Sequence, residues 1–291
     1  MTKCSIDKPI AKISIIECYN CESTSQLPYL DENGFSLVKC ANCGLLYVNN
    51  PPAPDVVEES TQRGVHQGDH SLQVTGRFNS ETVARMSVIL TEVFGHCEPP
   101  LGRWLDVGCG HGELLIAGMK TFGARVQFLG VEPNTGKVLS AKSRNLDVTQ
   151  GSIEAAKGNF EVISLMDVYS HLVHPPSFLQ ALSSKLSPGG LLLLQTGDSA
   201  DFSAHETLKP VCLPDHLSFT SERILRAMLA KMNYEVVTVK KYPYLYRDAK
   251  TIAKEVIKLV VPGKRSYLRY YLNWRKYSQQ NMFILARKRA A

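Results

Sequence analysis

A glycine-rich turn lies between an apolar segment and a helical pattern near the middle of the chain. Its sequence is Leu105-Asp106-Val107-Gly108-Cys109-Gly110-His111-Gly112. Because glycine lets the backbone approach a ligand closely, such a turn between a strand and a helix is a candidate binding site. Glu132 ends the next apolar segment about twenty residues later, where a carboxylate can accept both hydroxyls of an adenosine ribose. Together, the turn and the acid predict a cofactor that contains adenosine.

The spacing of the glycines separates two kinds of adenosine cofactor. The dinucleotide fingerprint needs glycine at its first, third and sixth positions, but Glu113 occupies the sixth position here. A carboxylate at a helix N-terminus would repel a pyrophosphate, so NAD is disfavoured. The pattern Asp106-x-Gly108-x-Gly110-x-Gly112 instead resembles the first motif of class I S-adenosylmethionine-dependent methyltransferases. The resemblance extends over most of residues 80–239.

This resemblance implies a set of cofactor-binding residues. The glycine turn would lie beside the methionine part of S-adenosylmethionine, Asp106 would orient its amino group, and Glu132 would hold the ribose. Ile153 would pack on the adenine with Ser152 near the exocyclic amine, although many relatives have aspartate at the position of Ser152. The full set is Asp106, Gly108, Cys109, Gly110, Glu132, Pro133, Ser152, Ile153 and Met166.

Four cysteines near the N-terminus have the spacing of metal ligands. Cys18-x-x-Cys21 and Cys40-x-x-Cys43 are separated by 18 residues, as in the two knuckles of a zinc ribbon. Four thiolates complete a closed tetrahedral site, so the zinc would be structural and not catalytic. About fifty residues cannot build a stable core, and the metal would supply much of the folding free energy. The alternative is four unrelated thiols.

Three residues are candidates for proton removal from an acceptor. Methyl transfer to a hydroxyl requires alignment of the nucleophile, exclusion of water and a base. His171 follows the predicted fourth strand, and His216 lies in a loop after the fifth, on the side where ligands bind in such folds. Tyr169 is the third candidate. For each of them the alternative is a structural hydrogen bond.

The elements that would position these residues alternate between strand and helix. We predict strands at 103–107, 126–131, 146–148, 160–166, 191–195, 235–239 and 282–286, and helices at 80–94, 112–122, 135–144, 176–186 and 221–232. The pattern predicts an α/β fold with a doubly wound, mostly parallel, seven-stranded Rossmann-like sheet. We expect a zinc-ribbon module over 1–50, a proline-rich linker and candidate mobile lid over 51–78, and the S-adenosylmethionine-binding methyltransferase domain over 79–291.

Composition limits the cellular setting. The chain has 291 residues, of which 44% are hydrophobic, enough for one large α/β core and one small module. The first residues contain no apolar run of signal-peptide length, so we expect a cytoplasmic protein without a membrane span. Eight cysteines in a reducing cytosol indicate thiols or metal ligands.

Positive charge is concentrated near the C-terminus. Residues 240–291 contain 14 lysines and arginines against two acidic residues. Most of this charge falls in 243–279, an insertion between the last two predicted strands with two amphipathic helical patterns. Such basic, aromatic segments can bind an anionic membrane surface, stack on RNA, or pack within the protein or against a second copy in a homodimer. A membrane-binding surface would make the protein peripheral at the inner membrane surface.

The acceptor has three interpretations. Zinc ribbon, proline linker and class I domain in this order resemble bacterial methyltransferases that modify sugars, polysaccharides or natural products, which favours a small-molecule or sugar-type acceptor. The basic C-terminal region fits an RNA methyltransferase, but the chain lacks an Asn-Pro-Pro-Tyr-like base-clamping tetrapeptide. The third interpretation is a non-enzymatic regulator that binds the cofactor.

Overall fold

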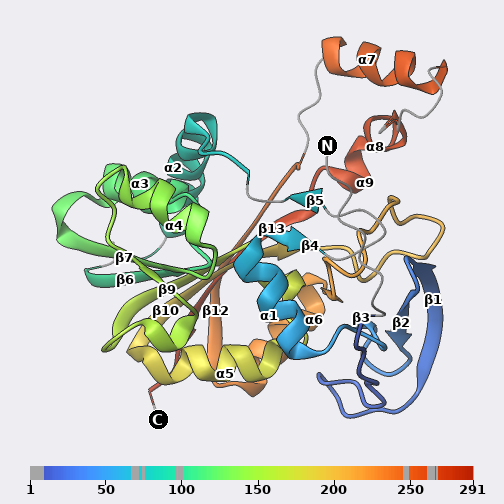
Figure 1. Ribbon diagram of the computed structural model, residues 1–291, viewed down its shortest axis with the longest axis horizontal. Helices are drawn as coiled ribbons and strands as arrows, with labels where there is room; N and C mark the ends of the chain where they lie inside the picture. Colours follow the sequence, from blue (N-terminus) through green and yellow to red (C-terminus); the bar gives the residue numbers. More distant parts are fainter. Residues whose placement is uncertain are drawn as a thin grey trace.

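The main part of the protein is a seven-stranded sheet with helices on both faces (Figure 1). The computed structural model describes residues 10–66, 72–73, 76–95, 97, 101–244, 249–260, 266 and 268–290. The strand order is β12-β13-β10-β9-β6-β7-β8, and only β13 runs against its neighbours in this sheet. The predicted mostly parallel α/β sheet is confirmed. Its strands are β6 (Gly102–Val107), β7 (Val126–Glu132), β8 (Val148–Gln150), β9 (Phe160–Met166), β10 (Leu186–Gly197), β12 (Tyr234–Tyr242) and β13 (Asn281–Lys288).

The two faces of the sheet belong to two separate cores. Alternate residues of a strand point to opposite faces, so in β9 Val162 enters one core and Ile163 the other. The first core packs against α2 (Ser80–Phe94), α3 (Glu113–Phe122) and α4 (Thr135–Lys142). The second packs against α5 (Pro175–Lys185) and α6 (Glu222–Lys231), on the other side of the sheet in Figure 1. Because six of its strands run in the same direction, their carboxyl ends meet at one edge of the sheet, where such folds bind ligands.

Element boundaries differ from the sequence expectations in a few places. The third strand, β8, begins at Val148 and not at Leu146, whose side chain instead lies against the backbone of Gly112. Helix α2 begins at Ser80, as predicted, and is capped by Asn79, whose side-chain oxygen accepts a hydrogen bond from the Glu81 amide at 2.8 Å. Strand β10 is longer than predicted and has an irregularity between Leu186 and Leu191.

The segment expected to be a linker and mobile loop contains a helix. Pro54 begins α1 (Pro54–Arg63) at a position where its missing amide hydrogen costs nothing. Gly64 ends it in the left-handed conformation, with φ of 66°, and its amide donates to the carbonyls of Ser60 and Thr61. The expectation of a linker and mobile loop over 51–78 was therefore wrong for Pro54–Arg63, which is helical. The part of this segment at 67–71 and 74–75 lies outside the described residues.

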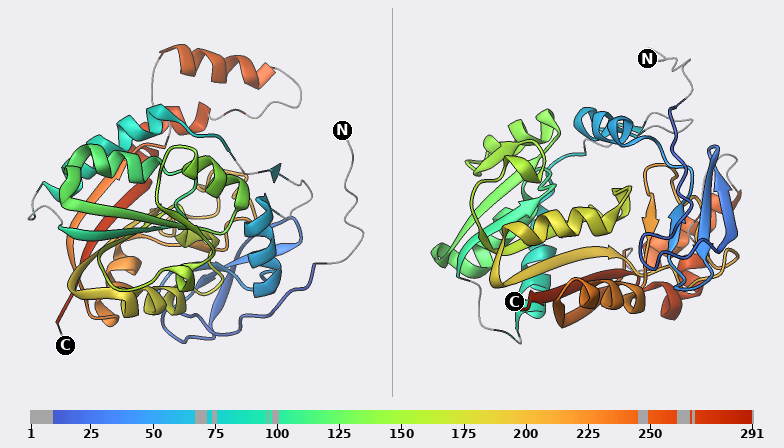
Figure 2. Two further views of the ribbon diagram at one scale, coloured as in Figure 1. Left: turned by 60° about the vertical axis from the view of Figure 1, so that its left-hand side comes forward. Right: turned by 90° about the horizontal axis from the view of Figure 1, so that it is seen from below.

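The N-terminal module is a small antiparallel sheet that a later segment of the chain completes. Its strands are β1 (Gln26–Glu32), β2 (Phe35–Cys40) and β3 (Leu46–Val48), and β11 (Ser218–Phe219) pairs with β3. The core of the module likewise includes Val211 and Leu217 from the segment before β11. The module therefore lies against the sheet domain, beside the segment that follows β10 (Figure 2). A short two-stranded sheet, β4 (Val65–His66) and β5 (Leu72–Gln73), follows α1.

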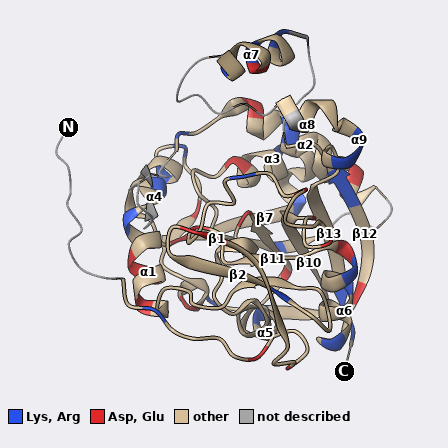
Figure 3. Cartoon of the chain, turned by 90° about the vertical axis from the view of Figure 1, so that its right-hand side faces the viewer, with Lys and Arg blue, Asp and Glu red and all other residues tan. Residues whose placement is uncertain are grey.

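The basic insertion lies between β12 and β13, and three helices lie in the part of it that the structure describes. They are α7 (Ala249–Val260), α8 (Leu268–Leu272) and α9 (Trp274–Tyr277), in place of the two predicted. Tyr270, Tyr271 and Tyr277 are buried and form a cluster with Phe202 and other apolar residues. Helix α7 stands out from the body above α8 (Figure 3). None of the helices in the described part of the chain is long and apolar enough to cross a bilayer.

Candidate functional site

A large cavity lies where the parallel strands end. Its volume is about 1740 Å³, and its walls come from the strand ends, α1 and the N-terminal module. Pockets for one drug-sized ligand measure roughly 300–1000 Å³, so this cavity has room for a cofactor and a second molecule. All nine cofactor-binding residues predicted from the sequence line it: Asp106, Gly108, Cys109, Gly110, Glu132, Pro133, Ser152, Ile153 and Met166.

The glycine turn after β6 needs glycine for its backbone. Gly108 has φ of 72° and Gly110 has φ of 57°, a left-handed conformation that other residues rarely adopt. A Cβ on Gly108 would lie 2.7 Å from a methyl carbon of Val168, whereas a Cβ on Gly110 would have no atom within 4 Å apart from those of Gly110 and its two chain neighbours. The amides of Gly108 and Cys109 both donate to the carbonyl of Val131, which fixes the turn against β7.

Glu132 links the second strand to this turn. Its Oε2 accepts a hydrogen bond from the Gly110 amide at 2.9 Å, and its Oε1 accepts one from the Asn134 amide at 2.9 Å. The side chain is buried, yet it also lines the cavity. Each carboxylate oxygen can accept a further hydrogen bond, so the group is prepared to hold a pair of hydroxyls.

Asp106 is a buried acid at the end of β6. Its Oδ1 accepts a hydrogen bond from the Ser164 hydroxyl at 2.6 Å, and the Trp104 indole donates to the same hydroxyl at 2.8 Å. Burial raises the pKa of Asp106 to about 7; the Ser164 hydrogen bond opposes this, and the charges of Glu132 and Glu113 add to it. A bound cation would return the group to its charged form.

The remaining predicted cofactor residues occupy the walls of the cavity. Ile153 is buried, and the Ser152 hydroxyl donates to the carboxylate of Glu154. Cys109 is buried as well, and burial raises the pKa of its thiol above the ordinary value, so it acts as a small turn residue and not as a nucleophile.

His171 forms a pair with Asp215, and both residues line the cavity. His171 ends the short helix η3 (Tyr169–His171), and its Nδ1 lies 2.9 Å from Oδ1 of Asp215 and 2.8 Å from the Asp215 carbonyl oxygen. Burial lowers the pKa of His171, but the hydrogen bonds and charge of Asp215, with the charge of Asp167, outweigh burial and raise it. Because Asp215 engages Nδ1, the proton-accepting atom would be Nε2.

The other two predicted bases do not line the cavity. Tyr169 is fully buried, its hydroxyl lies 3.8 Å from the Met228 sulfur, and burial raises its pKa, so we no longer assign it a catalytic role. His216 packs its ring 5.0 Å from that of His171, and its Nδ1 is 3.1 Å from the Val211 carbonyl oxygen. His216 therefore lies beside the His171–Asp215 pair, outside the cavity.

Sequence reasoning missed three polar residues of the cavity. Asp215 directly precedes His216, and a carboxylate beside a candidate base is a signal that could have identified it. Asp167 follows β9 with φ of 55°, a strained conformation of the kind found at functional sites. Gln195, near the end of β10, is buried, and its Oε1 has no hydrogen-bond partner among the described residues. Nothing in the local sequence marks Gln195.

The four cysteines of the N-terminal module come together. The Sγ atoms of Cys18 and Cys43 are 3.6 Å apart, those of Cys21 and Cys40 are 3.5 Å apart, and all four lie within 4.8 Å of one another. A disulfide needs about 2.05 Å between sulfurs, whereas four sulfurs about 2.3 Å from a zinc ion lie somewhat under 4 Å apart. The donor set and its spacing therefore suit a tetrahedral metal ion.

Comparisons with known proteins agree with this geometry. Residues 76–239 match the methyltransferase-domain family. The ubiquinone biosynthesis O-methyltransferase of Xanthomonas axonopodis pv. citri is 36% identical over 117 residues, which are 38% of this chain and 48% of that protein. The protein of the same name from Albidiferax ferrireducens is 31% identical over 115 residues, 36% of this chain and 45% of its own. The chain thus spans about half the length of the curated relatives it matches.

Solved structures with the same fold are more distant in sequence. A geranyl diphosphate methyltransferase in complex with S-adenosylmethionine aligns with a TM-score of 0.51 and 16% identity, covering 72% of this chain and 91% of the other. An S-adenosylmethionine-dependent methyltransferase from Archaeoglobus fulgidus aligns with a TM-score of 0.50 and 17% identity, covering 71% and 94%. These likenesses show the fold.

Proposed function

Since this chain belongs to the class I S-adenosylmethionine-dependent methyltransferases, we propose that it methylates a hydroxyl group of a small-molecule or sugar-type acceptor. The observation that carries the proposal is that His171 and Asp215 line the same cavity as the residues assigned to the cofactor. The curated relatives are named O-methyltransferases, which supports a hydroxyl as the methylated group.

Each part of the cavity has a role in this reaction. When bound, S-adenosylmethionine supplies a methyl group activated by a sulfonium. Glu132 would hold its adenosine part, the glycine turn would lie against its methionine part, and Asp106 would orient its amino group. The His171 Nε2 accepts the proton of the acceptor hydroxyl, and Asp215 orients the ring and stabilises its charged form. Helix α1 covers the site, since the Asn134 side chain donates to the Gln62 carbonyl at 3.0 Å.

The acceptor end of the cavity favours a molecule with an apolar part. We assign to this end the cavity-lining residues Ile13, Ile15 and Tyr19 of the N-terminal module with Val56 and Val57 of α1. These side chains would lie against hydrocarbon or an aromatic ring more favourably than against a bare sugar.

We propose that the four-cysteine cluster holds one structural zinc ion. Cys18, Cys21, Cys40 and Cys43 supply all four ligands of a tetrahedral site, so the ion would hold the knuckles together and take no part in methyl transfer. Zinc would also fix β2 and β3, the strands nearest to these cysteines.

We propose that the outer side of α7 binds an anionic membrane surface. Val256, Ile257 and Val260 are 48%, 60% and 82% exposed, and Lys250 and Lys254 lie beside them on the helix. An apolar strip flanked by lysines suits the interface of an anionic bilayer. RNA is less favoured because Tyr270, Tyr271 and Tyr277, which could have stacked on bases, are buried.

Transfer of a tritiated methyl group tests the activity. The protein is incubated with labelled S-adenosylmethionine and, separately, with pools of phenols and other apolar alcohols, of sugars and of RNA. Label in the alcohol or sugar pool is the expected result, and label in RNA alone would assign the protein to the RNA class. Tight cofactor binding without transfer to any pool would instead favour a cofactor-binding regulator.

A further inference from the structure

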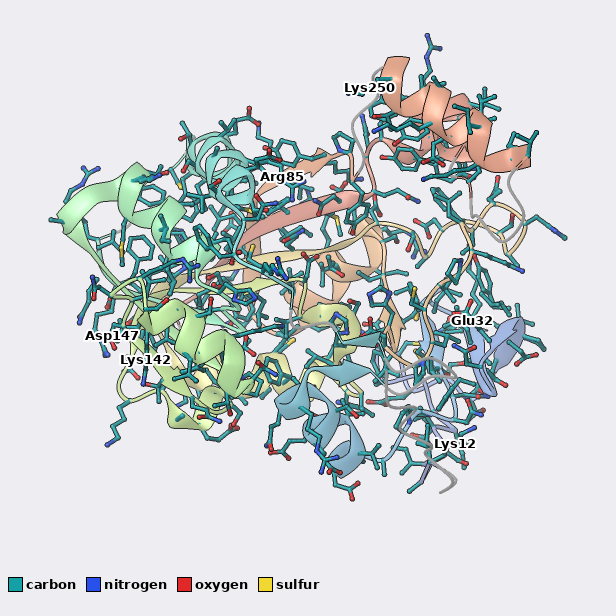
Figure 4. The ribbon with its side chains drawn as sticks, turned by 45° about the horizontal axis from the view of Figure 1, so that its top comes forward. Lys12, Glu32, Arg85, Lys142, Asp147 and Lys250 are labelled. Carbon is teal, nitrogen blue, oxygen red and sulfur yellow. The ribbon has the colours of Figure 1, made fainter. Side chains whose placement is uncertain are left out.

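The loop that carries Asp215 is held by the N-terminal module. Glu32, at the end of β1, accepts hydrogen bonds from two backbone amides of this loop: its Oε2 from Val211 at 3.1 Å and its Oε1 from Leu213 at 2.9 Å. The next residue of the module, Asn33, donates from its side chain to the Leu213 carbonyl at 2.7 Å. Figure 4 labels Glu32 on the module, beside the loops that follow β10.

The module also holds the other end of this loop. The Val48 amide of β3 donates to the Leu217 carbonyl at 2.9 Å, and the next two residues, Ser218 and Phe219, pair with β3 as β11. Asp215 and His216 therefore lie between two anchors that both come from the module. The side chains of Val211 and Leu217 are buried in the core of the module, which adds packing to the hydrogen bonds.

The loop has little regular structure of its own. Cys212 has φ of 64°, and the amides of Asp215 and His216 both donate to its carbonyl in a tight turn. Such a conformation persists only where the surroundings fix it. A carboxylate that accepts two backbone amides is a strong anchor, because each hydrogen bond is strengthened by the charge.

We propose that the N-terminal module positions the His171–Asp215 pair, and that Glu32 is the positioning residue through which it acts. The inference rests on the proposed function, in which this pair removes the proton of the acceptor. It gives the module a role in the reaction besides lining the cavity: the hairpin tip sets where Asp215 lies, and Asp215 sets the tautomer and direction of the His171 ring.

The test is a pH titration of His171 in which NMR records the signals of isotope-labelled histidine rings. S-adenosylhomocysteine is bound throughout, and the signal that disappears in His171→Asn is assigned to His171. In the described part of the chain, the titratable groups that face His171 are Asp215, His216 and Asp167, which directly follows β9. In Glu32→Ala and Glu32→Gln the midpoint should move to lower pH, because Asp215 withdraws while burial persists. Asp215→Asn should give the same shift. Asp31→Ala, which removes an exposed carboxylate from the same strand, should titrate like the wild type.

Binding of S-adenosylmethionine, measured by calorimetry, separates positioning from general damage. It should be unchanged in the Glu32 variants, because the residues assigned to the cofactor lie on the sheet domain. If the Glu32 variants do not fold, Asn33→Ala replaces them as the test, because it removes only the hydrogen bond to the Leu213 carbonyl. Its His171 midpoint should also move to lower pH, by less than in the Glu32 variants. The proposal would be overturned if the His171 midpoint in the Glu32 variants equalled that of the wild type, or if the same variants also lost affinity for S-adenosylmethionine. Neither result depends on methyl transfer, which can fail or succeed independently.

Discussion

The carboxylate of Glu132 accepts a hydrogen bond from the amide of Gly110 at 2.9 Å, so the acid that ends β7 and the turn that follows β6 form one unit. The other oxygen of Glu132 is bonded to the Asn134 amide at the start of α4. The carboxylate is thus held before any ribose reaches it. Little conformational entropy then remains to be lost on binding, which favours affinity.

Replacing either cofactor acid should weaken binding of S-adenosylmethionine. In Glu132→Ala the cofactor hydroxyls and the Gly110 amide lose their acceptor, and in Asp106→Ala the cofactor amino group loses its partner. Each should cost roughly 1–3 kcal/mol, measured by isothermal titration calorimetry. Glu154→Ala, at an exposed position of the same cavity, is the matched control and should change the affinity less. Preference for NAD over S-adenosylmethionine would contradict the assignment of the site.

Affinity for the cofactor should fall in acid through Asp106. The pKa of this group is about 7 without a ligand, and a bound ammonium stabilises the carboxylate. Below that pKa, binding must first release a proton, so the dissociation constant should rise by roughly tenfold per pH unit. Calorimetric titrations with S-adenosylmethionine between about pH 5 and about pH 8, a range that includes this pKa, provide the measurement. Asp106→Asn should make the dissociation constant less dependent on pH. A flat profile in the wild type would show that Asp106 does not meet the amino group.

Turnover should depend on His171 far more than on His216. His171→Ala removes the base and should lower kcat by roughly 10²–10⁴-fold, with cofactor binding unchanged. In the wild type, kcat should rise with pH through a pKa above the ordinary histidine value, because the neutral ring accepts the proton and Asp215 raises that pKa. His216→Ala should have a smaller effect because its ring lies outside the cavity. Full turnover in the double alanine variant, on an acceptor found by the transfer assay, would exclude both histidines.

The sequence located the cavity-lining residues around the glycine turn better than those around His171. Asp106, the glycine turn and Glu132 occur at fixed offsets within two neighbouring strand–helix units, so local spacing is enough to place them together. His171 and Asp215 are 44 residues apart, and their contact depends on a loop whose shape comes from Glu32 in another part of the chain. No periodic pattern carries that information.

The prediction of helices and of buried residues from the sequence was limited in the same way. Helix α1 has few apolar residues, so periodicity did not reveal it, although Pro54 at its start and Gly64 at its end are the usual boundary signals. For the aromatic residues of α8 and α9 the sequence left open a binding surface or packing within the protein, and Tyr270 and Tyr277 stack on each other inside the protein. Spacing along a helix shows which residues share a face and not what that face contacts.

Purified protein should contain about one zinc ion per chain. Replacing Cys18 and Cys43 with serine removes two of the four ligands, so the metal should be lost and the amides of β2 and β3 should exchange faster with deuterium. Elemental analysis and hydrogen exchange provide the two measurements. Cys97→Ser, at a cysteine outside the cluster, should keep the metal. Protein that is folded and free of zinc would contradict the assignment.

The last prediction concerns attachment of α7 to anionic membranes. Vesicles of phosphatidylcholine with phosphatidylglycerol should retain the protein in sedimentation at low salt, whereas phosphatidylcholine alone should retain much less. Each lysine near an anionic surface contributes about 1 kcal/mol, so Lys250→Glu with Lys254→Glu should weaken retention by at least about tenfold. Lys120→Glu with Lys142→Glu reverses two exposed charges on α3 and α4 and is the matched control (Lys142 and Lys250 are labelled in Figure 4).

The apolar strip of α7 should contribute independently of charge. Val256→Ser with Val260→Ser should reduce retention even at low salt, because less apolar surface enters the interface, while raising the salt should weaken mainly the electrostatic part. Analytical ultracentrifugation of the same variants tests the alternative of a homodimer. If the serine variant turns a dimer into a monomer while vesicles retain neither protein, the strip is a contact between two copies. Retention by RNA but not by vesicles, or equal retention of the lysine variants and their control, would likewise show that α7 does not bind the membrane.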